Sequence, residues 1–215
     1  MISFLCILYA MNLSASSKDK HWELIKDENG IKVYTLESPQ TAQETAPETA
    51  PETNIVKAKA IATLNAPLNK VRAILDDIDH RHEWIPYLKL SKALTNYNSN
   101  GNKNKRIEYS HFHAPWPASD RDFVYEIELI ASSDKQLVYK MKSVASELMP
   151  INKQIIRANL LETIYTLTAI NNKTTKVELI FHADPKGWIP DWIVNIIQRV
   201  LPYKILVKLG ERLKV

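Results

Sequence analysis

The sequence predicts an α+β fold in which an antiparallel sheet occupies the middle of the chain and helices stand at its ends. Segments with alternating apolar and polar residues follow one another between residues 87 and 183, whereas helical periodicity is confined to a stretch near residue 70 and to the C-terminal residues. Runs of strands with helices at the ends indicate an antiparallel sheet, not alternating βαβ units. Phosphate loops and dinucleotide fingerprints are absent. With 215 residues, 45% hydrophobic and 24% charged, the chain fits a single globular domain over residues 17–215.

The first residues, MISFLCILYAMNLSASSK, predict a signal peptide over residues 1–16. Their apolar run is too short to span a bilayer and is followed by small polar residues. No Lys or Arg precedes the run, so a wrongly placed translation start and a membrane-dipping N-terminus remain alternatives. We expect an exported protein, periplasmic if the source is bacterial, and otherwise a cytoplasmic one. Cys6 is the only cysteine, so cleavage would exclude thiol catalysis, disulfides and cysteine metal sites.

The next elements follow from local patterns. Trp22–Ile25 suggests a short helix or cap, Asn29-Gly30 marks a tight turn, and the β-branched run Ile31–Leu36 predicts the first strand. A Thr/Ala/Pro/Glu repeat at about residues 40–54 cannot bury a core and predicts a disordered loop. Ile55–Leu64 alternates as a strand.

Pro67 then opens a predicted helix that runs to Leu75, with an apolar face suited to packing on a sheet. Five β-patterned segments follow, the last of them divided at Asn171-Asn172, and Asn100-Gly101 marks a second turn. These segments lie near residues 87–97, 104–114, 121–131, 136–146 and 155–183.

The segment DPKGWIPDWIVNIIQRVLP, residues 184–202, predicts a turn that leads from the last strand into an amphipathic helix. Gly187 permits unusual backbone angles, and Pro190 suits a first helical turn. One helix face carries Ile189, Ile193, Ile196 and Val200. That face requires an apolar partner. Pro202 predicts a kink or division of the helix before Tyr203.

The basic excess of the chain is confined to its C-terminus. Residues 186–215 hold six Lys or Arg and two Asp or Glu, a net charge of 6 − 2 = +4, which equals the net charge of the whole chain. Without Lys-rich or Gly/Arg runs, this distribution argues against nucleic-acid binding. A transient membrane contact through a basic C-terminal helix fits better. The alternative is an ordinary solvated helix face.

Three motifs in order resemble the START family of StAR-related lipid-transfer domains, within the helix-grip, Bet v 1-like superfamily. They are DDIDHRHEWIPYL at residues 76–88, PWPASDRDFVYEI at residues 115–127 and DPKGWIPDWIVN at residues 184–195. The resemblance covers roughly residue 22 to the C-terminus. It implies a curved antiparallel sheet wrapped around a long C-terminal helix.

The resemblance also implies a function. In that family a tunnel between sheet and helix holds a sterol, a phospholipid or another lipid, and a loop and the helix control access. We therefore expect a monomeric lipid-binding or lipid-transfer protein without a cofactor or metal. The alternative is a cyclase, aromatase or hydrolase-like enzyme that acts on an apolar substrate in the same cavity, because polyketide cyclases share the helix-grip fold.

Alternation along the strands and the family resemblance together give the candidate site residues. The predicted cavity residues are Tyr109, His111, Phe123, Tyr125, Ile127, Tyr139, Met141, Leu179, Phe181, Ile193, Ile196, Ile197 and Val200. The predicted gate residues are Pro115, Trp116, Pro117, Gly187, Trp188 and Trp192. The three tryptophans suit either a membrane interface at the cavity mouth or packing on the sheet.

Three sets of polar residues are candidates for a chemical role. Some relatives keep a charged pair in the tunnel; here Glu108 lies near Arg106, but Ile127 occupies the neighbouring position where a cation is expected. The pairs His80/His82 and His111/His113 favour surface histidines over a metal site, since their separation along the chain speaks against convergent ligands. Asp120-Arg121-Asp122 favours an ion-pair network that fixes the Pro-rich loop over an acid–base pair.

Overall fold

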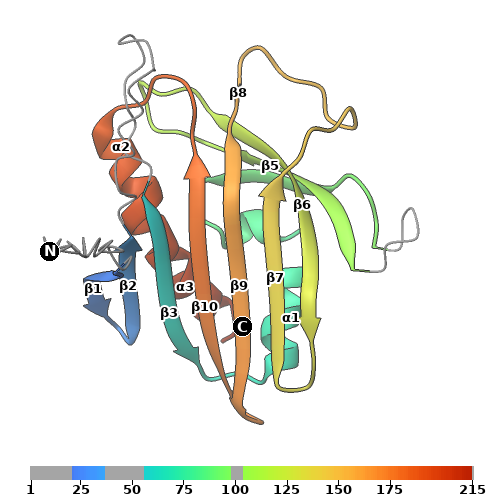
Figure 1. Ribbon diagram of the computed structural model, residues 1–215, viewed down its shortest axis with the longest axis vertical. Helices are drawn as coiled ribbons and strands as arrows, with labels where there is room; N and C mark the ends of the chain where they lie inside the picture. The colour runs from blue at the N-terminus through green and yellow to red at the C-terminus, as the bar shows by residue number, and fades with distance from the viewer. Residues whose placement is uncertain (1–20, 37–55, 98–103, 215) are drawn as a thin grey trace, which may run out of the picture.

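The computed structural model describes residues 21–36, 56–97 and 104–214, which form one antiparallel sheet with helices on one face (Figure 1). The order across the sheet is β1-β2-β3-β10-β9-β7-β6-β5-β4, and β8 adds a short parallel pairing to β6. The strands are β1 (Glu23–Glu28), β2 (Ile31–Leu36), β3 (Lys57–Leu64), β4 (Leu88–Ala93), β5 (Lys105–Phe112), β6 (Arg121–Ser132), β7 (Gln136–Ser143), β8 (Ile156–Arg157), β9 (Asn159–Asn171) and β10 (Thr174–Asp184).

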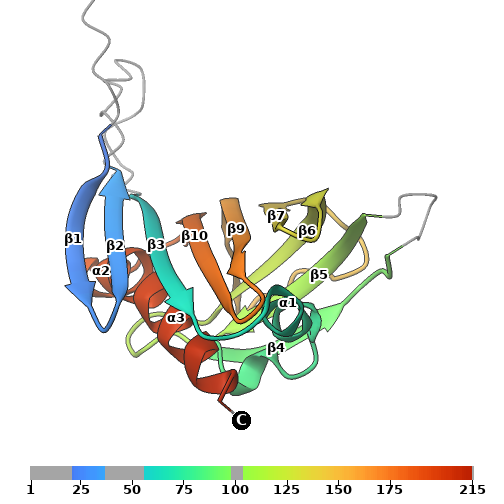
Figure 2. The same ribbon diagram turned by 90° about the horizontal axis from the view of Figure 1, so that it is seen from below.

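The helices lie on the concave face of the curved sheet (Figure 2). They are α1 (Leu68–Asp76), the 3-10 turn η1 (Arg81–Glu83), α2 (Asp191–Asn195), the π-helical turn η3 (Ile196–Val200) and α3 (Leu201–Arg212). The last three follow without a break and form the C-terminal helix. The predicted α+β class, with a curved antiparallel sheet around a long C-terminal helix, is thus confirmed.

Small side chains on β3 let the C-terminal helix approach the sheet closely. Ala60 and Ala62 are buried, and on the helix Leu206 and Leu209 are fully buried in the same cluster. Larger residues there would hold the helix away, because protein interiors are packed to the density of organic crystals. The core therefore closes tightly around α3.

The prediction of a helix or cap at Trp22–Ile25 is wrong. This segment enters β1, which pairs with β2 in an antiparallel hairpin. Asn29 and Gly30 both adopt positive φ, at 53° and 73°, the geometry that a two-residue hairpin turn of this hand requires. The predicted signal peptide, the loop at about 40–54 and the Asn100-Gly101 turn lie outside the described residues and stay predictions.

Pro202 does not divide the C-terminal helix. The helix widens just before it, where the Leu201 N–H bonds to the carbonyl of Ile196, five residues back, to form the π turn. Proline lacks an N–H and cannot bond to the carbonyl of residue 198. The predicted disturbance is therefore present, but as a wide turn within a continuous helix.

Candidate functional site

An apolar cavity lies between the concave face of the sheet and the C-terminal helix. Its volume is about 150 Å³. The strands contribute Phe123, Tyr125 and Ile127 from β6, Tyr139 and Met141 from β7, and Leu179 and Phe181 from β10. The helix contributes Ile193, Ile196 and Ile197. These ten predicted cavity residues therefore line the cavity.

Val200, also predicted to line the cavity, is not among its walls; Leu201 and Ile205 stand there instead. The π turn explains this difference. A wide turn inserts one extra residue, so the inward face that begins with Ile196 continues at Leu201, five residues later, and not at residue 200. A regular 3.6-residue period was the wrong assumption at this point.

Tyr109 and His111 were also placed wrongly, because β5 presents its other face to the cavity. Across the strand pair Glu108 lies opposite Tyr125 and Ser110 lies opposite Phe123, so these residues share the inner face. Ser110 lines the cavity, whereas the imidazole of His111 bonds to Asp120. The buried charge of Glu108 on the inner face reversed the polarity pattern that predicted the orientation of the strand.

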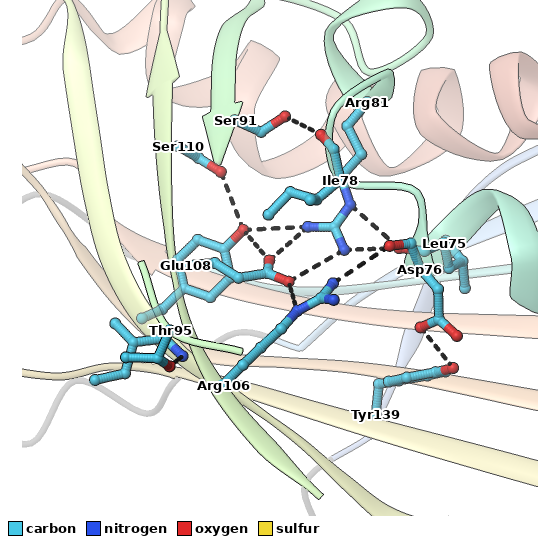
Figure 3. Close-up of polar contacts among 12 residues, drawn as sticks. Leu75, Asp76, Ile78, Arg81, Ser91, Thr95, Arg106, Glu108, Ser110 and Tyr139 are labelled. Carbon is cyan, nitrogen blue, oxygen red and sulfur yellow. Dashed lines mark hydrogen bonds and ion pairs between the residues drawn. The ribbon is translucent and has the colours of Figure 1, made fainter. Parts of the chain in front are cut away.

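The cation that partners Glu108 is Arg81, from the η1 turn (Figure 3). Arg81 Nη1 donates to Glu108 Oε2 at 2.6 Å, and Nη2 donates to Oε1 at 3.4 Å. Arg106 Nε donates to the same carboxylate at 2.5 Å. The Tyr125 hydroxyl donates to it at 2.9 Å and lies 3.0 Å from the Ser110 hydroxyl. A buried carboxylate is thus held by two arginines and a tyrosine.

This network is complete without a ligand. Arg81 Nε and Nη2 donate to the Leu75 carbonyl at 3.2 and 2.6 Å, and Nη1 also reaches the Tyr125 oxygen at 3.4 Å. A guanidinium has five N–H donors, so all those of Arg81 are in use. Although Arg81 is at the cavity wall, it has no free donor to offer.

Charges in the network keep both partners ionised. Burial alone would raise the pKa of Glu108, but the charges of Arg81 and Arg106 hold it below its usual value. Burial alone would lower the pKa of Arg81, and Glu108 outweighs it so that the pKa is raised. Burial raises the pKa of the Tyr125 hydroxyl, and the negative charge of Glu108 adds to this effect. The hydroxyl therefore keeps its proton and donates a hydrogen bond to Glu108.

Sequence reasoning missed Arg81 as the partner of Glu108. It sought a cation on the next strand, at the position of Ile127, which lies opposite Arg106. The sequence offers only a weak signal, an arginine between two histidines shortly before Trp84. In the structure Arg81 is 5% exposed within an otherwise exposed turn, and a buried arginine requires a partner.

The Pro-rich loop after β5 meets the start of the C-terminal helix at one end of the cavity. Ala118 of the loop packs on the cluster Ile189, Ile193 and Val194, and Pro115 lines the cavity. Trp116, Pro117 and Trp188 belong to the surface around this contact. The loop and the helix are therefore in direct contact at this end of the cavity.

Asp120 and Arg121 hold the Pro-rich loop in place through hydrogen bonds. Asp120 accepts hydrogen bonds from His111, His113, Lys89 and the Ala114 N–H. Burial opposes the charge of Asp120, but these donors hold its pKa well below its usual range.

The buried Arg121 side chain links the loop to the turn before the helix. It donates to the carbonyl of Ser119 in the loop and to those of Pro185, Lys186 and Trp188 in the turn. Asp122 instead pairs with Arg157 at 2.7 Å. The predicted structural role of the Asp120-Arg121-Asp122 cluster therefore agrees with the geometry, since its three side chains point to separate partners.

Three tryptophans surround this end of the cavity. Trp116 is 89% exposed, Trp188 63% and Trp192 50%, so none of them packs fully on the sheet. Gly187 stands between the sheet and these residues with φ of 64°, and a Cβ there would lie 2.8 Å from Ile156 Cδ1. Glycine is required at this turn on both counts.

Histidines of the two pairs bond to different carboxylates. His80 bonds to Asp77 at 2.8 Å, and His111 and His113 share Asp120. Among the described residues there is no group of three or more His, Cys, Asp or Glu side chains arranged to hold a metal ion. In the same part of the chain no helix is long and apolar enough to cross a bilayer.

Comparison with known proteins agrees with the observed fold. The model of the START domain matches residues 3–202. The chain belongs to the START domain family. An uncharacterized protein of Pseudomonas aeruginosa is 25% identical over 81% of this chain and 77% of its own length. Phosphatidylcholine transfer protein of Bos taurus is also 25% identical, over 81% of this chain and 75% of that protein.

Solved START structures share the fold. Human STARD10 superposes with a TM-score of 0.74 at 20% identity, covering 90% of this chain and 73% of the other. A STAR-related lipid transfer protein from Xanthomonas axonopodis gives a TM-score of 0.68 at 24% identity, over 90% of this chain and 99% of that fragment. The family and the lipid-transfer relatives support lipid binding as the general activity of this START domain.

Proposed function

We propose that this START domain takes one lipid into the cavity, shields it from water and carries it between membranes without chemical change. The observation that carries the proposal is the cavity itself, which is walled by aromatic and aliphatic side chains of the sheet and the C-terminal helix. Each CH2 group buried there contributes about 0.8 kcal/mol, so a long acyl chain or a sterol can be held by apolar area alone.

The volume of the cavity implies movement. A space of about 150 Å³ is below the roughly 300–1,000 Å³ of typical small-molecule sites. A lipid therefore needs the walls to part. The contact of Ala118 with the cluster at the start of the C-terminal helix is the place where two separate segments meet, and we propose it as the gate.

The exposed tryptophans Trp116, Trp188 and Trp192 support docking of this gate on a membrane surface. Indole rings favour the boundary between headgroups and acyl chains. A gate that opens against a bilayer lets a lipid pass between two apolar phases without crossing water. The basic residues of α3 are a second possible contact with anionic headgroups.

The three described residues that are candidates for an enzymatic role all contact other side chains of the protein. The candidates Glu108, His111 and Asp122 are each held by an ion pair or a hydrogen bond: Glu108 with two arginines, His111 with Asp120 and Asp122 with Arg157. A general base must reach a proton of the substrate. The proposed function therefore assigns these residues to the scaffold.

Native mass spectrometry of the purified protein tests the function. We expect a lipid to copurify, and a protein stripped of lipid to extract one from vesicles. A folded protein that carries no lipid and extracts none from vesicles of phosphatidylcholine and sterol would contradict the proposal. Product formation from a bound apolar substrate, abolished by His111→Ala, would favour an enzyme instead.

A further inference from the structure

One buried hydroxyl at the cavity wall has no hydrogen-bond partner among the described residues. In the described part of the chain, four buried side-chain atoms lack a hydrogen bond, and only one of them belongs to a cavity-lining residue: Thr163 Oγ1. Thr163 is 5% exposed. Leaving a buried polar group unpaired costs about 1–3 kcal/mol, so such a group in a binding cavity requires an explanation.

The strand register directs Thr163 toward the cavity. On β9 it lies opposite Met141 of β7 and Phe181 of β10, and both of these line the cavity. Directly opposed residues in antiparallel strands share a face of the sheet. The Thr163 side chain therefore stands in the middle of the wall, between two apolar neighbours.

A second hydroxyl follows on the same face. Tyr165 comes two residues later on β9, about 7 Å along the strand, and also lines the cavity. No hydrogen bond joins its hydroxyl to another described residue. Burial raises the pKa of Tyr165 to about 12, against the opposing charge of Arg81, so the hydroxyl keeps its proton at neutral pH.

Six other polar side chains at the wall are already engaged. Arg81, Ser110 and Tyr125 belong to the Glu108 network, and the Tyr139 hydroxyl bonds to Asp76 at 3.0 Å. Arg121 and His113 are held at the end where the Pro-rich loop meets the helix. The buried unpaired oxygen at the wall therefore belongs to a neutral group on β9, not to the ion pair.

We propose that Thr163 and Tyr165 form a polar subsite that binds an uncharged oxygen of the cavity lipid, either a hydroxyl or an ester carbonyl. This subsite rests on the proposed lipid-binding function and narrows its ligand to lipids that bring a hydrogen-bonding oxygen inside the cavity. A pure hydrocarbon leaves the subsite unmatched, and a charged headgroup finds no free ion partner there.

The test compares three fluorescent probes on the same protein. Diphenylhexatriene is a hydrocarbon without oxygen, dehydroergosterol brings a hydroxyl, and pyrene-labelled phosphatidylcholine brings ester carbonyls. Thr163→Val removes the hydroxyl at nearly constant volume. We expect it to weaken binding of the oxygen-bearing lipid that the wild type prefers by about three- to tenfold, the effect of one hydrogen bond, and to leave diphenylhexatriene binding unchanged.

Matched variants guard the interpretation. Thr163→Ser keeps a hydroxyl and should retain wild-type affinity, and Thr166→Val makes the same change on the outer face of β9, opposite Glu178, and should have no effect. Tyr165→Phe removes the second hydroxyl and should also weaken binding of the preferred lipid. It takes the place of the Thr163 variants if these fail to fold. Thr163→Val should unfold at or above the wild-type temperature, since it removes an unpaired buried group.

The outcomes separate the two claims. A wild type that binds diphenylhexatriene but neither oxygen-bearing lipid, or variants that bind every probe like the wild type, would overturn the subsite and leave the lipid-binding function standing. In the second case a trapped water satisfies the hydroxyls. A wild type that binds none of the three probes would overturn the proposed function itself.

Discussion

Glu108 is fully buried and carries a charge, and Arg81 and Arg106 are what make that possible. Such a network adds little stability compared with well-packed apolar side chains of similar volume, because the charged groups lose their hydration. Removing only one partner is different, since the other charge stays buried without compensation. The network therefore fixes the η1 turn to β5 in one arrangement.

Glu108→Gln should lower the free energy of unfolding by about 3–5 kcal/mol, because it leaves two arginines without their counter-charge. Urea unfolding followed by circular dichroism measures the change. The matched control is Glu211→Gln, which breaks the exposed pair with Lys208 and should have only a small effect. Equal losses for the two variants would show that burial of the network does not matter.

The same network makes stability depend on pH. The pKa of Glu108 in the folded protein lies below its ordinary value of 4.5, so the unfolded chain takes up the proton first as the pH falls. The stabilisation is complete above pH 4.5 and should be lost as the pH falls toward the folded-state pKa. Asp120, whose pKa is also lowered, adds to this loss.

In Glu108→Gln the slope of unfolding free energy against pH below 4.5 should be shallower, since position 108 no longer titrates and only the other carboxylates contribute. Urea titrations at a series of pH values provide the measurement. Parallel profiles for wild type and variant would mean that Glu108 has the same pKa in the folded and unfolded states.

At the scale of elements, the turn before the C-terminal helix and the helix itself use glycine for opposite reasons. Gly187 adopts φ of 64° and has Ile156 Cδ1 2.8 Å from where a Cβ would stand. Gly210 lies within α3, and a Cβ there would meet Leu64 at an ordinary 3.5 Å. The first glycine is required by backbone geometry, and the second is not.

Gly187→Ala should therefore destabilise the protein by about 1–2 kcal/mol, and Gly210→Ala should stabilise it by about 0.5–1 kcal/mol. Thermal unfolding of both variants gives the comparison. Gly187→Ala combined with Ile156→Val should recover only the part of the loss caused by crowding, because the backbone strain remains. A neutral Gly187→Ala would show that the turn relaxes freely.

The π turn is the second feature of this helix. Pro202→Ala supplies an N–H that can bond to the carbonyl of residue 198 and so favours a regular α-helix over the wide turn. We expect slower amide hydrogen exchange over residues 196–201. We also expect slower lipid uptake, because the part of the helix that follows the gate contact becomes harder to deform. Pro67→Ala at the start of α1 is the control. If it slows lipid uptake as much as Pro202→Ala does, the slower uptake does not come from the π turn.

The positions of the strands and helices could be predicted from the sequence better than the side of each element that faces the cavity. Alternation and turn residues gave nearly every strand, since both patterns report local geometry. The orientation of β5 was predicted wrongly, because the distant Arg81 allows Glu108 to be buried. The inward face of the helix was predicted wrongly at Val200, because a 3.6-residue pattern does not reveal a π turn. Both errors arise where a tertiary contact or a backbone irregularity overrides the local pattern.

At the scale of the whole molecule, the C-terminal helix separates two features that the sequence places close together. α2, which contains Trp192, lies toward one end of the molecule, whereas the C-terminus lies toward the other end (Figure 1). From Trp192 to Lys208 the helix advances about 24 Å at 1.5 Å per residue. A flat membrane that contacts the tryptophans therefore does not readily reach the basic half of α3.

Because of this separation, an experiment can tell which of the two ends docks on a membrane. Replacing Trp116, Trp188 and Trp192 by Ala should reduce binding to neutral phosphatidylcholine vesicles at least tenfold, because losing about 60 Å² of apolar burial already costs about 1.5 kcal/mol. All three side chains are at least half exposed, so thermal unfolding should change little. Lys204→Glu with Lys208→Glu should leave neutral-vesicle binding intact and affect only anionic vesicles, by at most about 1 kcal/mol per charge. Vesicle sedimentation compares the two variants; the reverse pattern would assign docking to the basic half of α3 and require the gate to open away from the membrane.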